Sequence, residues 1–234
     1  LFGSSGVKAP EFPGKLVWFN SQALSLEFLR GKVVLVDFWT YSCINCQRTL
    51  PILKTWWEKY QDCGLVVIGV HSPEFNFEKN PDNVKAALKK YGVSWPVVLD
   101  NDMKIWNSYA NHYWPAKYLI DQEGKIIYSH FGEGNYIETE LKIQDALKEA
   151  GFKVSDKVSS GSQSGSAGLE AGQTPELYFG SLCGSVQNIP QDISLQPDQI
   201  YSIGKWSQED EFLQHDRVTS DLDDLIILEY RAKD

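Results

Sequence analysis

Residues 33–39 (Val-Val-Leu-Val-Asp-Phe-Trp) form a nearly continuous apolar run that is rich in β-branched residues. Such a run is typical of a strand that is buried on both faces of an α/β sheet. A second apolar run, from Leu65 to Val70, follows a helix-length stretch from Ile44 to Tyr60. Because strands joined through a helix pair in parallel, these three segments predict a strand–helix–strand unit at the centre of an α/β sheet.

The residues that follow supply the remaining elements of this domain. Asn80-Pro81 is typical of a helix start. We expect the other helices and strands at Asp82–Tyr91, Pro96–Leu99, Ala116–Ile120, Lys125–His130 and a last helix that ends at Gly151. The order β-α-β-α-β-β-α predicts a three-layer α/β/α domain with a mixed central sheet, to which a hairpin adds an antiparallel edge.

Composition divides the chain into four parts. Residues 1–14, which include Gly3-Ser4-Ser5-Gly6, are expected to be a flexible leader, and residues 15–153 the α/β domain. Half of the residues from 155 to 174 are Ser or Gly, and large apolar residues almost vanish there. We therefore expect residues 154–175 to be a flexible linker.

Residues 176–234 are expected to form a small β domain. Strand-like runs lie between polar turns at Tyr201–Ile203, Trp206–Phe212 and Leu225–Ala232. About 60 residues are fewer than the ~100 of a typical β-sandwich, and the chain stops directly after its best strand. We expect this domain to be truncated, or to be completed by another chain.

The balance of charge excludes some partners. The 22 Lys and Arg residues against 31 Asp and Glu residues give a net charge of −9. Nucleic-acid-binding proteins and proteins that dock on anionic lipid normally carry a basic face, so neither partner is expected. No apolar run approaches the roughly 20 residues of a membrane-spanning helix, and the first residues do not resemble a signal peptide.

Two of the four cysteines, Cys43 and Cys46, lie where the first buried strand ends and a helix begins. Unpaired N–H groups and the positive end of the helix dipole stabilise a thiolate there, and only the thiolate attacks disulfides. Cys46 lies one turn deeper and can reach the first sulfur. We expect Cys43 to form a mixed disulfide with a substrate and Cys46 to resolve it.

Cys46 has to lose its proton before it attacks. Asp37, six residues before Cys43 on the buried strand, is a candidate proton acceptor whose pKa we expect burial to raise. A purely structural role for this carboxyl is the alternative.

Several strings in the chain resemble known sequences. Val36-Asp37-Phe38-Trp39, then Cys43-x-x-Cys46, then Pro51 resemble the thioredoxin pattern, and Pro115 matches the cis-proline that packs against the cysteine pair in that family. More closely, residues 31–151 resemble the extracytoplasmic thioredoxin-like domain of DipZ-type proteins, in the redoxin/TlpA-like branch. The strings that carry this resemblance are Phe38-Trp39-Thr40-Tyr41-Ser42-Cys43-Ile44-Asn45-Cys46, Gly69-Val70-His71-Ser72-Pro73-Glu74-Phe75, Tyr113-Trp114-Pro115-Ala116-Lys117-Tyr118-Leu119-Ile120-Asp121 and His130-Phe131-Gly132-Glu133-Gly134.

The resemblance implies a thiol–disulfide oxidoreductase, without a cofactor, that acts on protein disulfides outside the cytoplasm, in the periplasm or on the outer face of the plasma membrane. The family typically joins this domain to a CcdA-like membrane domain and to a carbohydrate-binding-module-like β domain, whose start Thr174–Gly180 resembles. It therefore implies a membrane-tethered reductase that receives electrons through the membrane, with cell-wall glycan as a candidate ligand. Ser42 and Ile44-Asn45 replace the Trp and Gly-Pro of ordinary thioredoxins, so the direction of electron flow does not carry over.

Aromatic residues around the pair are expected to form the walls of a substrate site. Trp39, Tyr41 and Trp114 are the candidates, together with Ser42, and core packing is the alternative for Trp39. Pro115 in cis would leave backbone groups of Trp114 free to pair with an extended substrate.

Several polar residues have a structural interpretation as well as a functional one. Half of a zinc site is the alternative for the cysteine pair, but no second pair exists and no metal is expected. Cys63 and Cys183 are taken as incidental thiols, with a bond between them as the alternative. His71 and Glu74 follow the second strand and are expected to anchor a loop, and Glu78 is expected to lie at a solvated helix start.

Two further functions stay open. Thr40 lies three residues before Cys43, as in the peroxiredoxin motif, although Val36 replaces the proline of that motif, so a thiol peroxidase is one alternative. A cell-wall glycan-binding module is the other, since Tyr178, Tyr201 and Trp206 offer rings that can stack on sugars.

Overall fold

The computed structural model describes residues 6–159 and, in the C-terminal part, residues 177, 179, 181, 185–188, 195–203, 206–215 and 225–228. The chain divides into two compact units, one that ends at residue 167 and one that begins at residue 168. The linker residues 160–175, together with Tyr178 and Cys183, lie outside the described residues. The suggested bond between Cys63 and Cys183 therefore stays a prediction.

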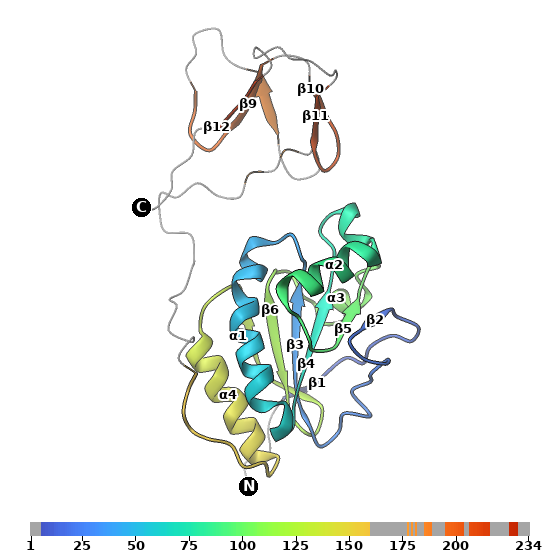
Figure 1. The fold of residues 1–234 in the computed structure, drawn as a ribbon, viewed down its shortest axis with the longest axis vertical. Coiled ribbons are helices and arrows are strands. Elements are labelled where there is room, and N and C mark those ends of the chain that lie inside the picture. Colours follow the sequence, from blue (N-terminus) through green and yellow to red (C-terminus); the bar gives the residue numbers. More distant parts are fainter. Residues whose placement is uncertain are drawn as a thin grey trace. The chain divides into compact units, whose positions relative to one another are not determined.

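Seven strands form the sheet of the first unit (Figure 1). They are β1 (Val7–Lys8), β2 (Trp18–Phe19), β3 (Val33–Trp39), β4 (Leu65–His71), β5 (Val97–Leu99), β6 (Ala116–Ile120) and β7 (Lys125–Phe131). Their order is β1-β7-β6-β3-β4-β5-β2. Strand β4 pairs in parallel with β3 and β5, whereas β6 runs antiparallel to β3 and β7, which confirms the predicted mixed sheet.

The helices of this unit are α1 (Ile44–Tyr60), α2 (Pro81–Tyr91), α3 (Lys104–Ser108) and α4 (Tyr136–Glu149), with 3₁₀ helices η1 (Gln61–Cys63) and η2 (Asn76–Lys79). Helix α1 starts directly beyond β3, and its buried face is supplied by residues such as Leu50, Leu53 and Trp56. Asn80 caps α2 by accepting a hydrogen bond from the N–H of Asp82, as its position predicts. Within the described residues, no helix is long and apolar enough to cross a membrane.

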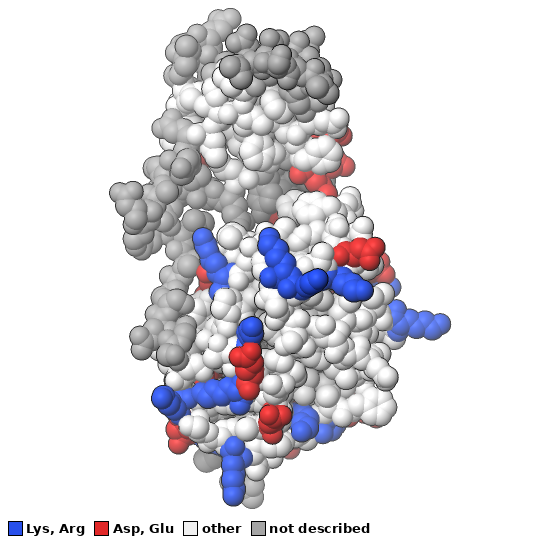
Figure 2. All heavy atoms as spheres, viewed as in Figure 1, with Lys and Arg blue, Asp and Glu red and all other residues white. Residues whose placement is uncertain are grey.

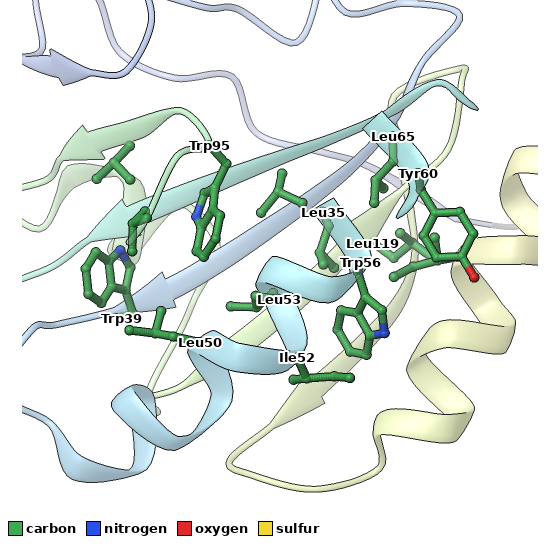
Figure 3. Close-up of a cluster of buried hydrophobic side chains, with 14 of the residues drawn as sticks. Leu35, Trp39, Leu50, Ile52, Leu53, Trp56, Tyr60, Leu65, Trp95 and Leu119 are labelled. Atoms are coloured by element: carbon green, nitrogen blue, oxygen red, sulfur yellow. The ribbon is translucent and has the colours of Figure 1, made fainter. Parts of the chain in front are cut away.

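Side chains of β3 alternate between two cores, one on each face of the sheet. Leu35 and Trp39 belong to the larger core, together with residues of α1 such as Leu53 (Figure 3). The same core contains buried residues of α2 and α4. Val36 and Phe38 belong to the second core, with side chains of α3 and of the N-terminal segment. The sheet is therefore the middle of three layers, as the element order predicts.

The N-terminal segment is more ordered than its composition suggests. Strand β1 pairs with β7, and Ala9 and Phe12 are buried in the second core. The sheet thus extends into residues 1–14, which were expected to be a leader. Strands of two residues and a helix as short as α3 carry no periodic pattern, so the sequence does not reveal them.

The described part of the second unit consists of short strands. Strands β12 (Leu225–Leu228), β9 (Ile200–Ile203) and β8 (Val186–Asn188) form a sheet in that order, and β10 (Trp206–Gln208) pairs antiparallel with β11 (Leu213–His215). The single strand expected over Trp206–Phe212 is wrong. The chain turns back there, and the N–H of Glu209 donates to the carbonyl oxygen of Phe212 across 2.9 Å.

We predict that Leu53→Ala lowers the free energy of unfolding by about 2–5 kcal/mol, because the side chain is fully buried in the larger core and its loss leaves a cavity. Urea denaturation followed by tryptophan fluorescence measures this change. Ile137→Ala is the matched control on α4, where the side chain is 45% exposed, and it should change stability by no more than about 0.5 kcal/mol. Equal effects of the two substitutions would contradict this assignment of the core.

Candidate active site

The two cysteines lie at the N-terminus of α1, directly beyond the end of β3. Cys43 is the N-cap residue of the helix, and its sulfur accepts a hydrogen bond from the N–H of Cys46 across 3.2 Å. Cys43 is half-buried, whereas Cys46 is fully buried. The more accessible sulfur is therefore the one that the sequence indicates as the nucleophile.

Burial is the main influence on the second cysteine. It raises the pKa of Cys46 well above 9.0, the ordinary value for a thiol, because a thiolate loses its hydration there. The neighbouring Cys43 and the carboxylate of Asp37 raise this pKa further, while a hydrogen bond from the backbone of Thr40 lowers it. Cys46 is thus protonated near neutral pH and needs a base before it can attack.

Asp37 lies on the face of β3 that carries Leu35 and Trp39, which is the face covered by α1. Burial raises the pKa of its carboxyl above 3.8, as the sequence predicts, and Lys117 opposes this rise. The two side chains form an ion pair with 3.3 Å between Oδ1 and Nζ, and both are almost fully buried. Neither group has another hydrogen-bond partner among the described residues.

Lys117 is a site residue that the sequence analysis missed. It lies on β6 directly opposite Asp37 in the register of the antiparallel pair. One signal was available, since Lys117 is the single charged residue in a five-residue strand that is otherwise apolar or aromatic. Its partner could not be read from the sequence, because the register between β3 and β6 is a tertiary feature.

The segment before β6 approaches the site through a cis peptide bond. The bond between Trp114 and Pro115 is cis, as the resemblance implies. The indole N–H of Trp114 donates to the carbonyl oxygen of Ser72 across 3.0 Å, and its ring lies 4.1 Å from that of Trp106. Trp114 is therefore held in place and half-buried, consistent with a wall of the site.

The other expected substrate contacts divide into two kinds. Tyr41 is half-buried and Ser42 is exposed, so both can reach a bound molecule. Trp39 has no exposed surface and packs in the larger core (Figure 3), so the expectation that it contacts a substrate is wrong. The strand alternation that directs Trp39 toward α1 also removes it from the surface.

Four apolar side chains on segments that carry or contact the candidate site residues are exposed, which the sequence analysis did not expect. Ile44 follows Cys43, and Tyr113 precedes Trp114. The ring of Tyr113 lies 5.3 Å from that of Phe131, and the ring of Phe77 lies 6.1 Å from that of Tyr41. We name Ile44, Phe77, Tyr113 and Phe131 the apolar rim; their exposed fractions are 50%, 50%, 56% and 46%.

Glu78 is not at a solvated helix start, as the sequence analysis expected, but is fully buried. Its carboxylate accepts hydrogen bonds from the hydroxyls of Thr40 and Ser42. These donors lie 38 and 36 residues away, so no local pattern could have revealed the contact. Glu78 is therefore buried against the segment that precedes Cys43.

His71 anchors the same segment, as expected. Its Nε2 accepts a hydrogen bond from the backbone N–H of Tyr41 across 3.4 Å, and its ring stacks on that of Tyr41. Burial lowers the pKa of His71 to about 4, so the imidazole is neutral near pH 7. Glu74 contributes its backbone N–H to Glu78.

The described residues contain no group of three or more His, Cys, Asp and Glu side chains that could hold a metal ion. Cys43 and Cys46 supply two sulfurs, whereas a structural zinc site needs four ligands. The chemistry available at this site is therefore that of a thiol pair beside a buried carboxyl.

Comparisons with known proteins agree with this geometry. The model of the AhpC/TSA family matches residues 5–129. Protein DipZ of Mycobacterium tuberculosis is 40% identical over 243 residues, which cover 97% of this chain and 34% of that protein. The chain thus spans about a third of the length of this relative, and the resemblance to DipZ-type proteins is confirmed.

Two shorter proteins match about three fifths of this chain. Thiol-disulfide oxidoreductase YkuV of Bacillus subtilis is 27% identical over 140 residues, 60% of this chain and 94% of that protein. A crystal structure of a thioredoxin-like superfamily protein superposes with a TM-score of 0.57 at 27% identity and covers 60% of this chain and 96% of its own. The predicted thioredoxin-like fold is confirmed.

We predict that Lys117→Met makes stability fall as pH rises. Loss of the ammonium removes the influence that lowers the pKa of Asp37, so this pKa rises further above its unfolded value near 3.8. The folded state then binds the proton more tightly than the unfolded state, and the free energy of unfolding decreases with increasing pH above about 4. An unpaired buried charge typically costs about 3–5 kcal/mol.

Urea denaturation between pH 4 and pH 8 gives the slope of the free energy of unfolding against pH. It is measured for the wild type, Lys117→Met and the double variant Asp37→Asn/Lys117→Met. The double variant is the control, since it has no carboxylate to titrate and should lose the added pH dependence. A Lys117→Met slope equal to that of the wild type would show that the two groups are not coupled.

Proposed function

The chain belongs to the AhpC/TSA family, and from that premise we propose that it is a thiol–disulfide oxidoreductase that acts on protein disulfides through Cys43 and Cys46. One observation carries the proposal: a half-buried sulfur caps a helix, and a fully buried thiol lies behind it within the influence of the Asp37 carboxyl. The thiol-disulfide oxidoreductase of Bacillus subtilis, which matches this chain over most of its own length, supports the same activity.

In the first step, the thiolate of Cys43 attacks one sulfur of a substrate disulfide. The substrate S–S bond breaks, a mixed disulfide forms with Cys43, and the first substrate thiolate leaves. The helix N-terminus favours the attacking thiolate, because its free N–H groups and dipole stabilise negative charge. The hydrogen bond from the N–H of Cys46 to the Cys43 sulfur is the direct contact of this kind.

In the second step, Cys46 resolves the mixed disulfide. Its proton passes to the carboxylate of Asp37, and the resulting thiolate attacks the Cys43 sulfur. The intramolecular disulfide forms, the second substrate thiolate leaves, and two electrons have passed from the pair to the substrate. Lys117 keeps enough of the Asp37 carboxyl ionised for it to accept this proton, because its cation opposes the rise that burial causes in the pKa.

The surface around Cys43 suits an extended polypeptide. The apolar rim and the half-buried rings of Tyr41 and Trp114 offer contacts to apolar side chains on both sides of a substrate cysteine. Backbone groups beside the cis bond at Pro115 can pair with the substrate main chain in the manner of an added strand.

The proposed setting is outside the cytoplasm, with a CcdA-like membrane domain whose dithiol returns the Cys43–Cys46 disulfide to the reduced form. The support for this setting is the similarity to protein DipZ over nearly the whole chain. We propose a carbohydrate-binding-module-like β domain for residues 176–234 on the same ground. Nucleic acid is not proposed as a partner, since the net charge is −9 and Figure 2 shows acidic and basic side chains interspersed on one face.

The alternative functions have less support. The Thr40 hydroxyl donates to Glu78, so it does not point a proton at Cys43 as a peroxide-binding threonine would. Tyr201 is 4% exposed and cannot stack on a sugar, and the indole N–H of Trp206 is taken up by the carbonyl oxygen of Ile203. The suggested role of Tyr201 in glycan binding is therefore wrong.

We predict that Cys46→Ala traps the first intermediate. With insulin as the protein disulfide, the wild type should turn over in dithiothreitol, whereas pre-reduced Cys46→Ala, mixed with insulin after the dithiothreitol has been removed, should accumulate a mixed disulfide on Cys43 that intact mass spectrometry detects. Cys43→Ala should form no adduct. Cys63→Ala is the control that removes a thiol outside the site and should retain wild-type turnover. Insulin attached elsewhere than Cys43, or full turnover by Cys46→Ala, would refute the two-step exchange.

A further inference from the structure

Glu78 is a buried carboxylate with four hydrogen-bond donors around it. Its Oε1 accepts from the hydroxyls of Thr40 and Ser42, the latter across 2.5 Å. Its Oε2 accepts from the backbone N–H groups of Glu74 and Phe75, across 2.6 and 2.9 Å. No Lys, Arg or His in the described ranges forms an ion pair with it. The negative charge is thus held by neutral donors alone.

These contacts tie together two loops that follow neighbouring parallel strands. Glu74 and Phe75 belong to the loop after β4, whereas Thr40 and Ser42 belong to the loop between β3 and α1. The second loop touches both cysteines, because Ser42 directly precedes Cys43 and the backbone of Thr40 donates a hydrogen bond to the Cys46 sulfur. Glu78 therefore holds the segment that places the two sulfurs.

The carboxylate of Glu78 lies one hydrogen bond from Ser42, the residue before Cys43. A buried charge is screened less than one in water, so a carboxylate one hydrogen bond from the residue before Cys43 disfavours a thiolate there. The groups around it do not cancel this charge: His71 is neutral near pH 7, Tyr41 is a neutral phenol, and Lys117 is paired with Asp37. A destabilised thiolate makes the reduced pair less stable relative to the disulfide, which is the reverse of the situation in a strong oxidant.

We propose that Glu78 is a positioning residue of the redox site, which fixes the loop of Thr40 and Ser42 and whose charge keeps the Cys43–Cys46 pair strongly reducing. The inference rests on the proposed function and deepens it, because it names the side chain whose charge sets the direction of electron flow. Electrons then leave the pair for the substrate disulfide.

The equilibrium that reports this effect is balanced: the protein dithiol and glutathione disulfide give the protein disulfide and two glutathione thiols. We expect Glu78→Gln to lower the equilibrium constant for this oxidation about tenfold, which is roughly 30 mV for a two-electron couple. The amide is close to isosteric and can still accept from the backbone N–H groups while its NH₂ donates to the hydroxyl oxygens. The substitution therefore removes the charge and retains the contacts.

The measurement uses the full chain, equilibrated in glutathione buffers and read by mass spectrometry of the peptide that holds Cys43 and Cys46. The rate of Cys43 alkylation by iodoacetamide between pH 5 and pH 10 is the second readout, and the midpoint of its rise should move to lower pH in Glu78→Gln. Glu138→Gln on α4 is the matched control. Its exposed charge is screened by water and salt, so the equilibrium constant should stay within about twofold of the wild type.

Ser42→Ala tests the same proposal, with an expected shift in the opposite direction to that of Glu78→Gln. Because Ser42 is exposed, we expect this variant to fold. Loss of the hydroxyl removes one donor from the carboxylate but leaves its charge. We expect the equilibrium constant for oxidation to rise a few-fold and the alkylation midpoint to move to higher pH. Shifts of Glu78→Gln and Ser42→Ala in the same direction, or no shift in Ser42→Ala, would overturn the proposal in favour of a purely structural role.

The wild type separates this inference from the proposed function. If the wild-type pair forms no reversible disulfide in these buffers, the thiol–disulfide exchange itself fails. If the wild-type pair equilibrates normally and the variants do not shift as described, only the role of Glu78 is lost.

Discussion

Desolvation of ionisable groups beside one thiol pair is the physical constraint on which the site depends. Cys46 is buried under the first turn of α1, and Asp37 and Lys117 are buried on the sheet below that turn. The carboxyl of Asp37 and the amine of Lys117 would be charged in water near neutral pH, but in the interior the charged forms are costly unless a partner is close. The site therefore holds a protonated thiol, a carboxyl whose proton affinity is raised and one cation that limits this rise.

The fold supplies these positions through backbone geometry. Alternation along β3 directs Asp37 toward α1, and the antiparallel register of β6 brings Lys117 opposite to it. Parallel pairing of β3 with β4 places the loops beyond both strands at one edge of the sheet, where Glu78 can bind Thr40 and Ser42. Groups of the site thus come from the consecutive elements β3 and α1 and from η2 and β6, which are distant from them in sequence.

Local patterns predicted the parts of this arrangement that depend on neighbouring residues. The buried run 33–39, the spacing of Cys43 and Cys46 and the resemblance around Pro115 led to the correct fold and to the cis bond. The pairings of Lys117 and Glu78 were not predicted from the sequence, because a single charged residue in a strand or near a turn does not indicate which distant residue will be its partner. The prediction that Trp39 contacts a substrate was wrong for a related reason. Trp39 is close to the cysteines in sequence, but the alternation of side chains along β3 directs its ring into the larger core.

The reduction potential of the wild-type Cys43–Cys46 pair tests the central claim most directly, since buried acidic groups beside the thiols should favour the disulfide over the dithiol. Equilibration of the full chain in defined dithiothreitol buffers, with mass spectrometry of the cysteine peptide, gives this potential. The account predicts a value near that of thioredoxin, about −270 mV. A value near about −120 mV, typical of a strong disulfide donor, would contradict it, because the reduced form would then be the one that the site stabilises.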